Sequence, residues 1–259
     1  MSWILLRGLT REARHWGDFP QQLAPGVQAP GTGITQVLAL DLPGNGEFYK
    51  QASPASVRGM VDFSRRQLLA SGLPPPYSLL AMSLGGMVAA DWAQRYPQEV
   101  ARLVLINTSL RAFSRVSERL RPGSWPALAL LAARWQSADN AERTIHQLTC
   151  QRATSRGEDL AAWLRIRKDA PVSAANAARQ LWAAALYAGS AAPGCPTLVL
   201  SSSGDQLVHP QCSARLAQAW RATHHEHPWA GHDLPHDDAR WVFQRIADWL
   251  DESMKLSFL

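Results

Sequence analysis

The sequence predicts an α/β fold, with a mostly parallel sheet of about six strands, helices on both faces of the sheet and an inserted helical lid. The first observation behind this prediction is a repeated pattern of short apolar run, turn and helical segment, which is typical of parallel strands joined by helices. The second is a stretch of about eighty residues between the fourth and fifth apolar runs that contains no convincing strand pattern. The third is the composition of the 259 residues, 46% apolar and 18% charged, which fits a globular protein with a sizeable core.

Six short apolar runs are the predicted strands. Because they alternate with helical segments, they are expected to pair in parallel and to be buried. A segment rich in turn formers, 41–46, follows the second run, and Pro97 ends the helix before the fourth. The last helix is predicted to run from Asp237 or Asp238, since aspartate is favoured at helix N-caps, to about 250. The runs are 3–6, 36–40, 77–82, 103–106, 197–200 and, more weakly, 223–228.

The long fourth connection is predicted to be a helical lid over 110–190, with the core formed by 1–109 and 191–259. Leu128, Leu131 and Trp135 recur at helical spacing within it. Parallel strands are usually joined by a helix and a few further residues, so a connection of this length is expected to be a subdomain.

Composition also excludes several classes of protein. The apolar run 3–6 ends at Arg7, too early for a signal peptide, and no stretch approaches the roughly 20 apolar residues of a membrane span. The three cysteines, Cys150, Cys195 and Cys212, are too few and too scattered for a disulfide framework. We therefore expect a cytoplasmic protein with reduced thiols.

The net charge of +5 and the pI near 9.5 do not by themselves indicate a nucleic-acid partner, because no binding motif accompanies them. The positive charge is concentrated in the lid, where 111–180 carries twelve basic and six acidic side chains. A solvated helical surface would explain this excess. Docking of an acidic partner at the lid would explain it as well.

The strongest chemical signal surrounds Ser83. The third apolar run leads directly into this serine, small residues stand at Ala81 and Gly85, and a helix begins at once. The pattern A-x-S-x-G is close to G-x-S-x-G, in which the small neighbours allow a nucleophile on a sharp strand-to-helix turn. The alternative is that Ser83 only caps a helix, since serine is a favoured N-cap.

Asp205 and His232 follow the fifth and sixth runs, so the three residues occur in the order Ser, Asp, His. Both are expected at the carboxyl ends of parallel strands, where open α/β sheets place their sites. Taken singly, Asp205 could be a turn residue and His232 a surface histidine. Asp233 is too close to His232 in sequence to turn back toward its ring, and Asn107 is neutral and cannot serve as the acid.

These motifs together resemble the α/β-hydrolase superfamily, a resemblance that covers nearly all of the predicted core. It implies a serine hydrolase whose triad is Ser83, Asp205 and His232. It also implies an oxyanion hole formed by the backbone N–H groups of Leu9 and Leu84. The motifs that carry it are Arg7-Gly8-Leu9 with Trp16, 41–46, 81–86, Arg95-Tyr96-Pro97, Asp205 and Gly231-His232.

Two features depart from the family pattern. Many members carry histidine where this chain has Arg7, although the backbone of the next residues performs the family's function there. Members also commonly begin with an antiparallel hairpin before the strand that corresponds to 3–6, for which this sequence has no residues. A trimmed sheet of about six strands is therefore expected.

Tryptophans are the candidate lining of an apolar acyl pocket, though aromatic residues at helical spacing are more often plain core. The candidates are Trp16, Trp125, Trp135, Trp163 and Trp182.

No metal or cofactor is expected, because triad chemistry requires none. His224, His225 and His227 could suggest a metal site. A strand, however, would place only two of them on one face, and a zinc site needs three or four converging ligands.

The leading functional hypothesis is a carboxylic ester hydrolase that forms an acyl-enzyme at Ser83 and takes an apolar acyl group. More narrowly, the chain resembles the small bacterial esterases that cleave the methyl ester of an acyl chain on acyl carrier protein. Thioesterases, C–C bond hydrolases, perhydrolases and lactonases share the triad and remain alternatives, since fold does not decide among them. A non-catalytic binding protein would be expected to have lost a triad member, and none is missing here.

Overall fold

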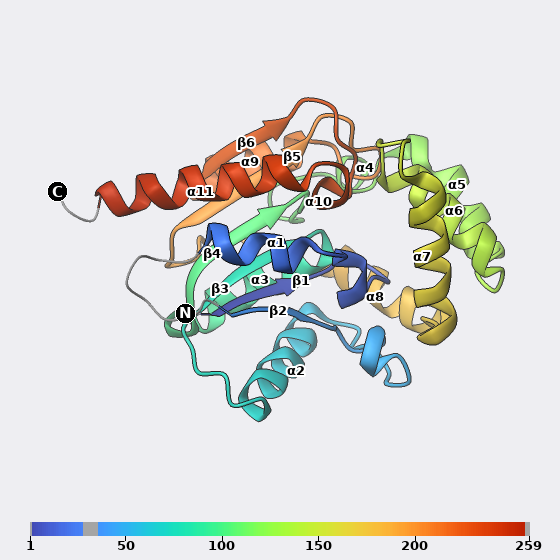
Figure 1. The fold of residues 1–259 in the computed structure, drawn as a ribbon, viewed down its shortest axis with the longest axis horizontal. Helices are drawn as coiled ribbons and strands as arrows, with labels where there is room; N and C mark the ends of the chain where they lie inside the picture. Colours follow the sequence, from blue (N-terminus) through green and yellow to red (C-terminus); the bar gives the residue numbers. More distant parts are fainter. Residues whose placement is uncertain (1, 28–35, 257–259) are drawn as a thin grey trace.

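The computed structural model describes residues 2–27 and 36–256 and contains one six-stranded sheet in the order β2-β1-β3-β4-β5-β6 (Figure 1). Every neighbouring pair of strands is parallel. The prediction of a mostly parallel sheet of about six strands is confirmed, although β4 begins three residues earlier than its apolar run. The strands are β1 Ser2–Leu6, β2 Val37–Leu40, β3 Tyr77–Met82, β4 Val100–Ile106, β5 Thr197–Ser202 and β6 Thr223–His227.

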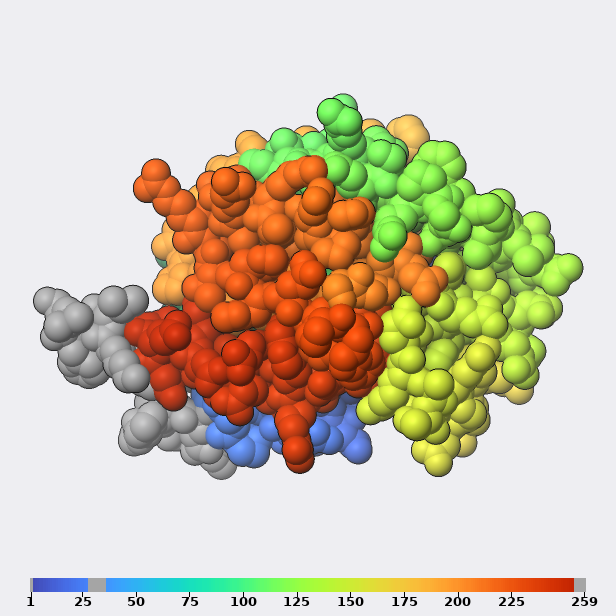
Figure 2. All heavy atoms as spheres, turned by 90° about the horizontal axis from the view of Figure 1, so that it is seen from above, coloured from blue at the N-terminus to red at the C-terminus, as the bar shows by residue number. Residues whose placement is uncertain are grey.

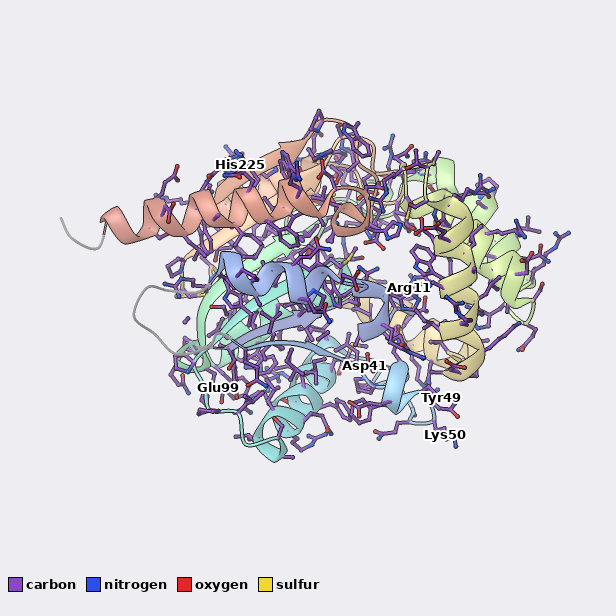
Figure 3. The ribbon with its side chains drawn as sticks, viewed as in Figure 1. Arg11, Asp41, Tyr49, Lys50, Glu99 and His225 are labelled. Carbon is purple, nitrogen blue, oxygen red and sulfur yellow. The ribbon has the colours of Figure 1, made fainter. Side chains whose placement is uncertain are left out.

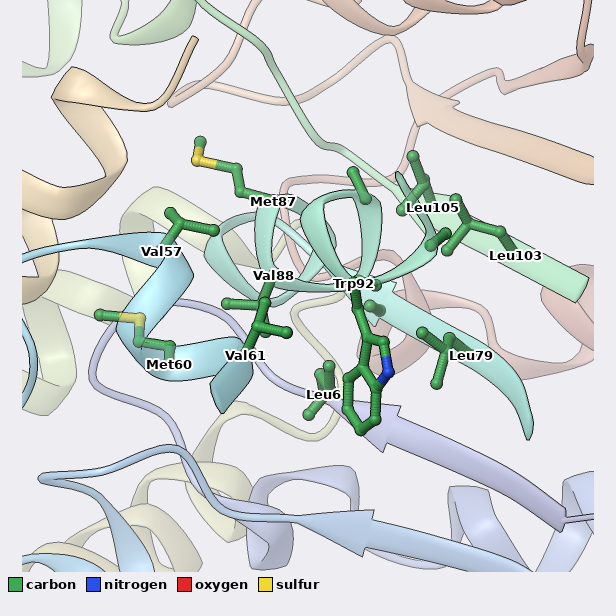
Figure 4. Packing of buried hydrophobic residues seen from close by; sticks show 14 of the residues in the cluster. Leu6, Val57, Met60, Val61, Leu79, Met87, Val88, Trp92, Leu103 and Leu105 are labelled. Atoms are coloured by element: carbon green, nitrogen blue, oxygen red, sulfur yellow. The ribbon is translucent and has the colours of Figure 1, made fainter. Parts of the chain in front are cut away.

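Helices cover both faces of this sheet, because alternate strand side chains point to opposite faces. Ile4 and Leu6 pack with helices α2, α3 and α9, a cluster that also holds the fully buried Trp92 of α3 (Figure 4). Trp3 and Leu5 pack on the other face with α1 and α11. These helices are α1 Phe19–Gly26, α2 Val57–Ala70, α3 Leu84–Arg95, α9 Gln211–Trp220 and α11 Ala239–Leu256.

The start of α3 lies unusually close to the strands, and its glycines allow this approach. A Cβ atom added to Gly85 would lie 2.5 Å from the carbonyl oxygen of Arg7. Such a contact is too short for any side chain, so a glycine is required where the helix passes the end of β1.

The whole connection between β4 and β5, which the structure describes throughout, is helical and contains no strand. We call residues 110–190, the segment for which the sequence predicts a lid, the helical insertion. It lies beyond the carboxyl ends of the strands and forms a lobe at one end of the molecule (Figures 1 and 2). Its helices are α4 Val116–Arg119, α5 Trp125–Ala133, α6 Ala138–Thr149, α7 Arg156–Asp169 and α8 Ala174–Leu186.

Helix α8 is bound to the core by a buried polar side chain, Gln180. Its Nε2 donates to Asn45 Oδ1 (2.8 Å) and to Ser53 Oγ (3.0 Å), and its Oε1 accepts from the backbone N–H of Thr10 (2.8 Å). In addition, Asn176 Oδ1 accepts from the N–H of Ser53 (2.9 Å). Helix α5, in contrast, has no buried residue.

A second link from the insertion to the core is the ion pair of Arg11 with Glu142 of α6, at 2.6 Å. The Arg11 side chain points from the segment after β1 toward the insertion (Figure 3). Both side chains are at least nine-tenths buried, so they hold α6 against this segment.

The chain ends in two helices rather than one. A short helix, α10 Leu234–Asp237, precedes α11. Asp238 stands between them, and its Oδ1 accepts from the N–H of Trp241 (3.0 Å), so it caps α11 as the sequence predicts. None of the helices in the described ranges is long and apolar enough to cross a membrane.

Candidate active site

Ser83 occupies a sharp turn between β3 and α3. Its φ is +53° and its ψ is −118°, a region that non-glycine residues adopt only under constraint. The turn is held by a hydrogen bond from its N–H to the carbonyl of Ile106 (3.0 Å). A Cβ atom added to Gly8 would lie 3.2 Å from Ser83 Cβ, so a side chain at this position would press against the serine. This is the backbone geometry that the A-x-S-x-G pattern predicts.

His232 and Asp205 are joined by a short hydrogen bond, with Nδ1 of the histidine 2.7 Å from Oδ2 of the aspartate. Asp205 is held in turn, because its Oδ1 accepts from the N–H groups of Leu207 (2.8 Å) and Val208 (2.9 Å). Burial by itself would lower the pKa of His232, but the charge and hydrogen bond of Asp205 outweigh it, and the pKa is raised. The pair therefore favours a histidine that readily accepts a proton.

Ser83 and His232 line one cavity of about 120 Å³ at the carboxyl ends of the strands. The sequence places these residues about 150 positions apart, and the sheet topology brings them to the same surface. The rest of the lining is largely apolar, and much of it comes from the helical insertion. Its apolar members are Leu9, Met82, Leu128, Leu131, Trp135, Ile145, Leu148 and Leu207.

The two residues predicted to supply oxyanion-hole amides lie on either side of the nucleophile. Leu9 lines the cavity directly after Gly8, which packs against Ser83. Leu84 is the first residue of α3, and its side chain is buried in the core. Its backbone N–H is one of those at the amino end of α3, where helices concentrate positive partial charge.

Arg7, the departure from the family pattern, has a partner that sequence reasoning missed. Its Nη1 and Nη2 donate to Oδ1 (3.0 Å) and Oδ2 (2.5 Å) of Asp233. Burial alone would raise the pKa of Asp233, but the Arg7 guanidinium outweighs burial and holds the pKa at about 2. The carboxylate of Asp233 is thus bound by Arg7, and Asp205 is the carboxylate that contacts the His232 ring.

Asn107 is neutral and cannot act as the acid of a triad, but its side chain holds the backbone of the loop that carries His232. Its Nδ2 donates to the carbonyl oxygens of His232 (2.9 Å) and Gly231 (3.3 Å) and to Ser202 Oγ (3.0 Å). Its φ of +48° lies in the left-handed region, which asparagine tolerates better than most residues. Its place at the end of β4 is the sequence signal that could have found it.

Of the tryptophans predicted to line the pocket, the structure brings one to the cavity. Trp135 is part of the lining. Trp16 is buried on the face of α1 and α11, and Trp163 packs against the rings of three histidines. Trp125 and Trp182 are 49% and 59% exposed. Helical spacing alone did not show which side of each insertion helix faces the site.

Two of the three histidines of β6 contact different side chains, so the strand does not bring the three to one centre. His224 Nε2 lies 2.9 Å from Ser201 Oγ, and His227 Nε2 lies 3.3 Å from Asp238 Oδ2. His225 lies on the same strand, at the edge of the sheet (Figure 3).

Comparison with known proteins gives one family and a set of similar chains. The model of the alpha/beta hydrolase fold family matches residues 4–239. A pimeloyl-[acyl-carrier protein] methyl ester esterase of Chromobacterium violaceum is 38% identical over 112 residues, 42% of this chain and 39% of that protein. One of Aromatoleum aromaticum with the same name is 40% identical over 123 residues, 48% of this chain and 42% of that protein. The matched part thus spans about two fifths of these relatives.

A solved structure extends the likeness over the full length. The thermophilic esterase from Thermogutta terrifontis superposes with a TM-score of 0.75 at 24% identity, covering 97% of this chain and 90% of that one. At this identity the likeness establishes the fold.

Proposed function

The chain belongs to the α/β-hydrolase fold family, and from this premise we propose that it is a serine hydrolase of carboxylic esters. One observation carries the proposal: the constrained Ser83 and the Asp205-bound His232 line the same cavity. A nucleophile and a base that face one small, mostly apolar space are what acyl transfer requires.

The proposed reaction proceeds through an acyl-enzyme. His232 takes the proton of Ser83 Oγ while the oxygen attacks the ester carbonyl, and Asp205 stabilises the imidazolium that forms. The backbone N–H groups of Leu9 and Leu84 would stabilise the tetrahedral oxyanion, each contributing roughly 3–4 kcal/mol in related chemistry. The imidazolium protonates the leaving alcohol, and water then attacks the acyl-enzyme by the same route.

The lining of the cavity supports an ester with an apolar acyl group. Leu131, Ile145 and Leu148 of the insertion face the space beside Ser83 and His232. Apolar walls favour an alkyl chain by about 0.8 kcal/mol for each buried methylene.

The narrower form of the proposal is a methyl ester of an acyl chain carried by an acidic carrier protein. The activity for which two partial relatives are named, pimeloyl-[acyl-carrier protein] methyl ester hydrolysis, supports this substrate. Exposed basic side chains on the insertion, including Arg134, Arg152 and Arg156, would attract such a carrier. The double variant Arg134→Glu, Arg156→Glu should raise KM for a carrier-bound ester at least about tenfold. It should leave KM for a free ester unchanged.

Covalent labelling tests the chemistry. We expect a fluorophosphonate probe to add one adduct to the wild type, detected by intact mass, and none to Ser83→Ala. Ser190→Ala, which changes an exposed serine, should label like the wild type. Equal labelling of Ser83→Ala, or no labelling of the folded wild type, would overturn the proposal.

A substrate panel then separates the alternatives. Faster turnover of oxygen esters than of thioesters of the same acyl group supports the esterase, and the reverse order supports a thioesterase. A protein that labels but cleaves neither would point to the C–C bond hydrolases or perhydrolases.

A further inference from the structure

A cluster of metal-binding side chains lies outside the candidate triad, between the helical insertion and the core. His146 and Cys150 stand four positions apart at the end of α6, a spacing that places both on one side of the helix. His236 belongs to α10, which begins two residues after His232. One ligand atom from each of these three side chains lies within 4.8 Å of the others.

A carboxylate lies beside the two histidines of this cluster. Asp159 Oδ2 of α7 lies 3.3 Å from His146 Nε2 and 3.0 Å from His236 Nε2. Tetrahedral zinc with bonds of about 2.0–2.1 Å to nitrogen and oxygen separates neighbouring ligand atoms by roughly 3.3 Å. The two distances from the carboxylate to the imidazoles are therefore close to the separation of neighbouring ligand atoms around zinc.

One nitrogen of the cluster is buried without a hydrogen-bond partner, as an unoccupied metal ligand would be. Within the described residues, His236 Nε2 is buried and makes no hydrogen bond, because Asp159 Oδ2 is near it but poorly aligned. Trp163 packs against the rings of His146 and His236, at 5.2 and 5.4 Å between ring centroids, and shields the cluster on one side.

We propose that His146, Cys150, His236 and Asp159 bind one divalent transition-metal ion of the zinc class. Two imidazoles, one thiolate and one carboxylate form a donor set that suits zinc rather than calcium or magnesium. On binding, the Cys150 thiol releases its proton to solvent and its sulfur forms the metal bond. Because protein side chains fill all four positions, the site is structural and leaves no coordination position for substrate.

The metal would join parts of the fold that meet beside the active site. Three ligands come from α6 and α7 of the insertion, and the fourth comes from α10, directly after the His232 loop. An ion that binds the folded chain and not the unfolded one stabilises this junction. The proposal is independent of the proposed ester hydrolysis, since none of these side chains is assigned to the reaction.

Titration of the chelator-treated protein with Co²⁺, a spectroscopic substitute for zinc, tests the site. We expect one equivalent to bind with a thiolate-to-cobalt absorption band and Trp163 fluorescence to change. Zinc should displace the cobalt with a Kd below about 1 μM, and one zinc per chain should survive gel filtration in elemental analysis.

Matched variants locate the binding. Cys150→Ser should abolish the absorption band, and His236→Gln should weaken zinc binding by about 100-fold or more. Cys195→Ser, at a thiol outside the cluster, and His225→Gln, at a histidine of β6, should bind like the wild type. Wild-type protein that gives no band, or that binds zinc only above about 100 μM, would overturn the proposal without reference to any variant. Full binding by the double variant Cys150→Ser, His236→Gln would overturn it as well.

Discussion

Arg7 and Asp233 form a buried two-point ion pair across 226 positions of the chain. One comes from the segment after β1, beside the predicted oxyanion-hole residue Leu9, and the other directly follows His232. The pair thus joins the two loops between which the proposed transition state would form. It also explains how the chain accommodates arginine where the family pattern has histidine.

Arg7→Met tests this pair. The change keeps an unbranched apolar chain beside Trp16 but leaves Asp233 buried without its partner, which typically costs 3–5 kcal/mol. We expect the free energy of unfolding in urea to fall by about that amount. The double variant with Asp233→Asn should recover much of it, because no charge is then left uncompensated. A single variant as stable as the wild type would show that the pair contributes little.

The pH dependence of catalysis should reflect the Asp205–His232 pair. His232 must be neutral to accept the serine proton, and the carboxylate of Asp205 outweighs burial to raise its pKa above the ordinary value of about 6.5. As the pH falls through this raised pKa, the fraction of neutral His232 falls and kcat/KM falls with it. We therefore expect the plot of kcat/KM against pH to fall on its acid side with a midpoint above pH 6.5. As a control, Asp238→Asn alters the carboxylate beside His227 and should leave the midpoint of this fall unchanged. A midpoint at pH 6 or lower would contradict the assignment.

Asn107→Ala should reduce kcat as well as stability. It removes the donor to the His232 carbonyl, and a buried polar group without a partner costs about 1–3 kcal/mol. Freed from this restraint, the imidazole should lose its alignment with Ser83, and kcat should fall by about 10- to 100-fold with KM nearly unchanged. Asn140→Ala, at an exposed position, is the control for both measurements. A loss of stability with unchanged kcat would mean that Asn107 has no positioning role.

Leu131→Trp should change the preference for acyl chain length. Leu131 lines the cavity, and a larger side chain there excludes part of the substrate. We expect kcat/KM for a p-nitrophenyl ester of eight carbons, relative to the acetate, to fall at least about tenfold, since one methylene is worth about 1–3 kcal/mol in an apolar pocket. Leu130→Trp places the same ring at a neighbouring, 47% exposed position of α5. It should keep the wild-type ratio, and equal shifts in both variants would argue against the cavity as the acyl site.

The centre of the sheet could be predicted because β1, β3, β4 and β5 are largely buried and appear as apolar runs, whereas the edge strand β6 is polar and gives a weaker pattern. Ser83, Asp205 and His232 each follow a strand of the parallel sheet, so their approach at one edge follows from the topology. Helix α1 is not among the predicted elements, since Pro20 and Pro25 interrupt its pattern. Pro20 lies in the first turn, where the missing N–H is not needed.

Contacts between distant segments could not be predicted in the same way. Nothing in the sequence pairs Arg7 with Asp233, and the place of Asn107 at the end of β4 does not show that its amide binds the His232 carbonyl. Such pairs depend on how loops from different strands pack, which periodicity does not encode. For the same reason helical spacing did not distinguish Trp135, which lines the cavity, from the exposed Trp125.

The helices of the insertion differ in how firmly they are held to the core, because buried hydrogen bonds fix α8 and α5 has no buried residue. Lifting α8 from the core would break every hydrogen bond of Gln180 and leave buried groups of the 43–53 loop without partners. Helix α5 has no buried side chain to withdraw, yet Leu128 and Leu131 form part of the cavity wall. The free energy needed to open the cavity is therefore lowest along α5, so a substrate too long for the closed space meets its least resistance there.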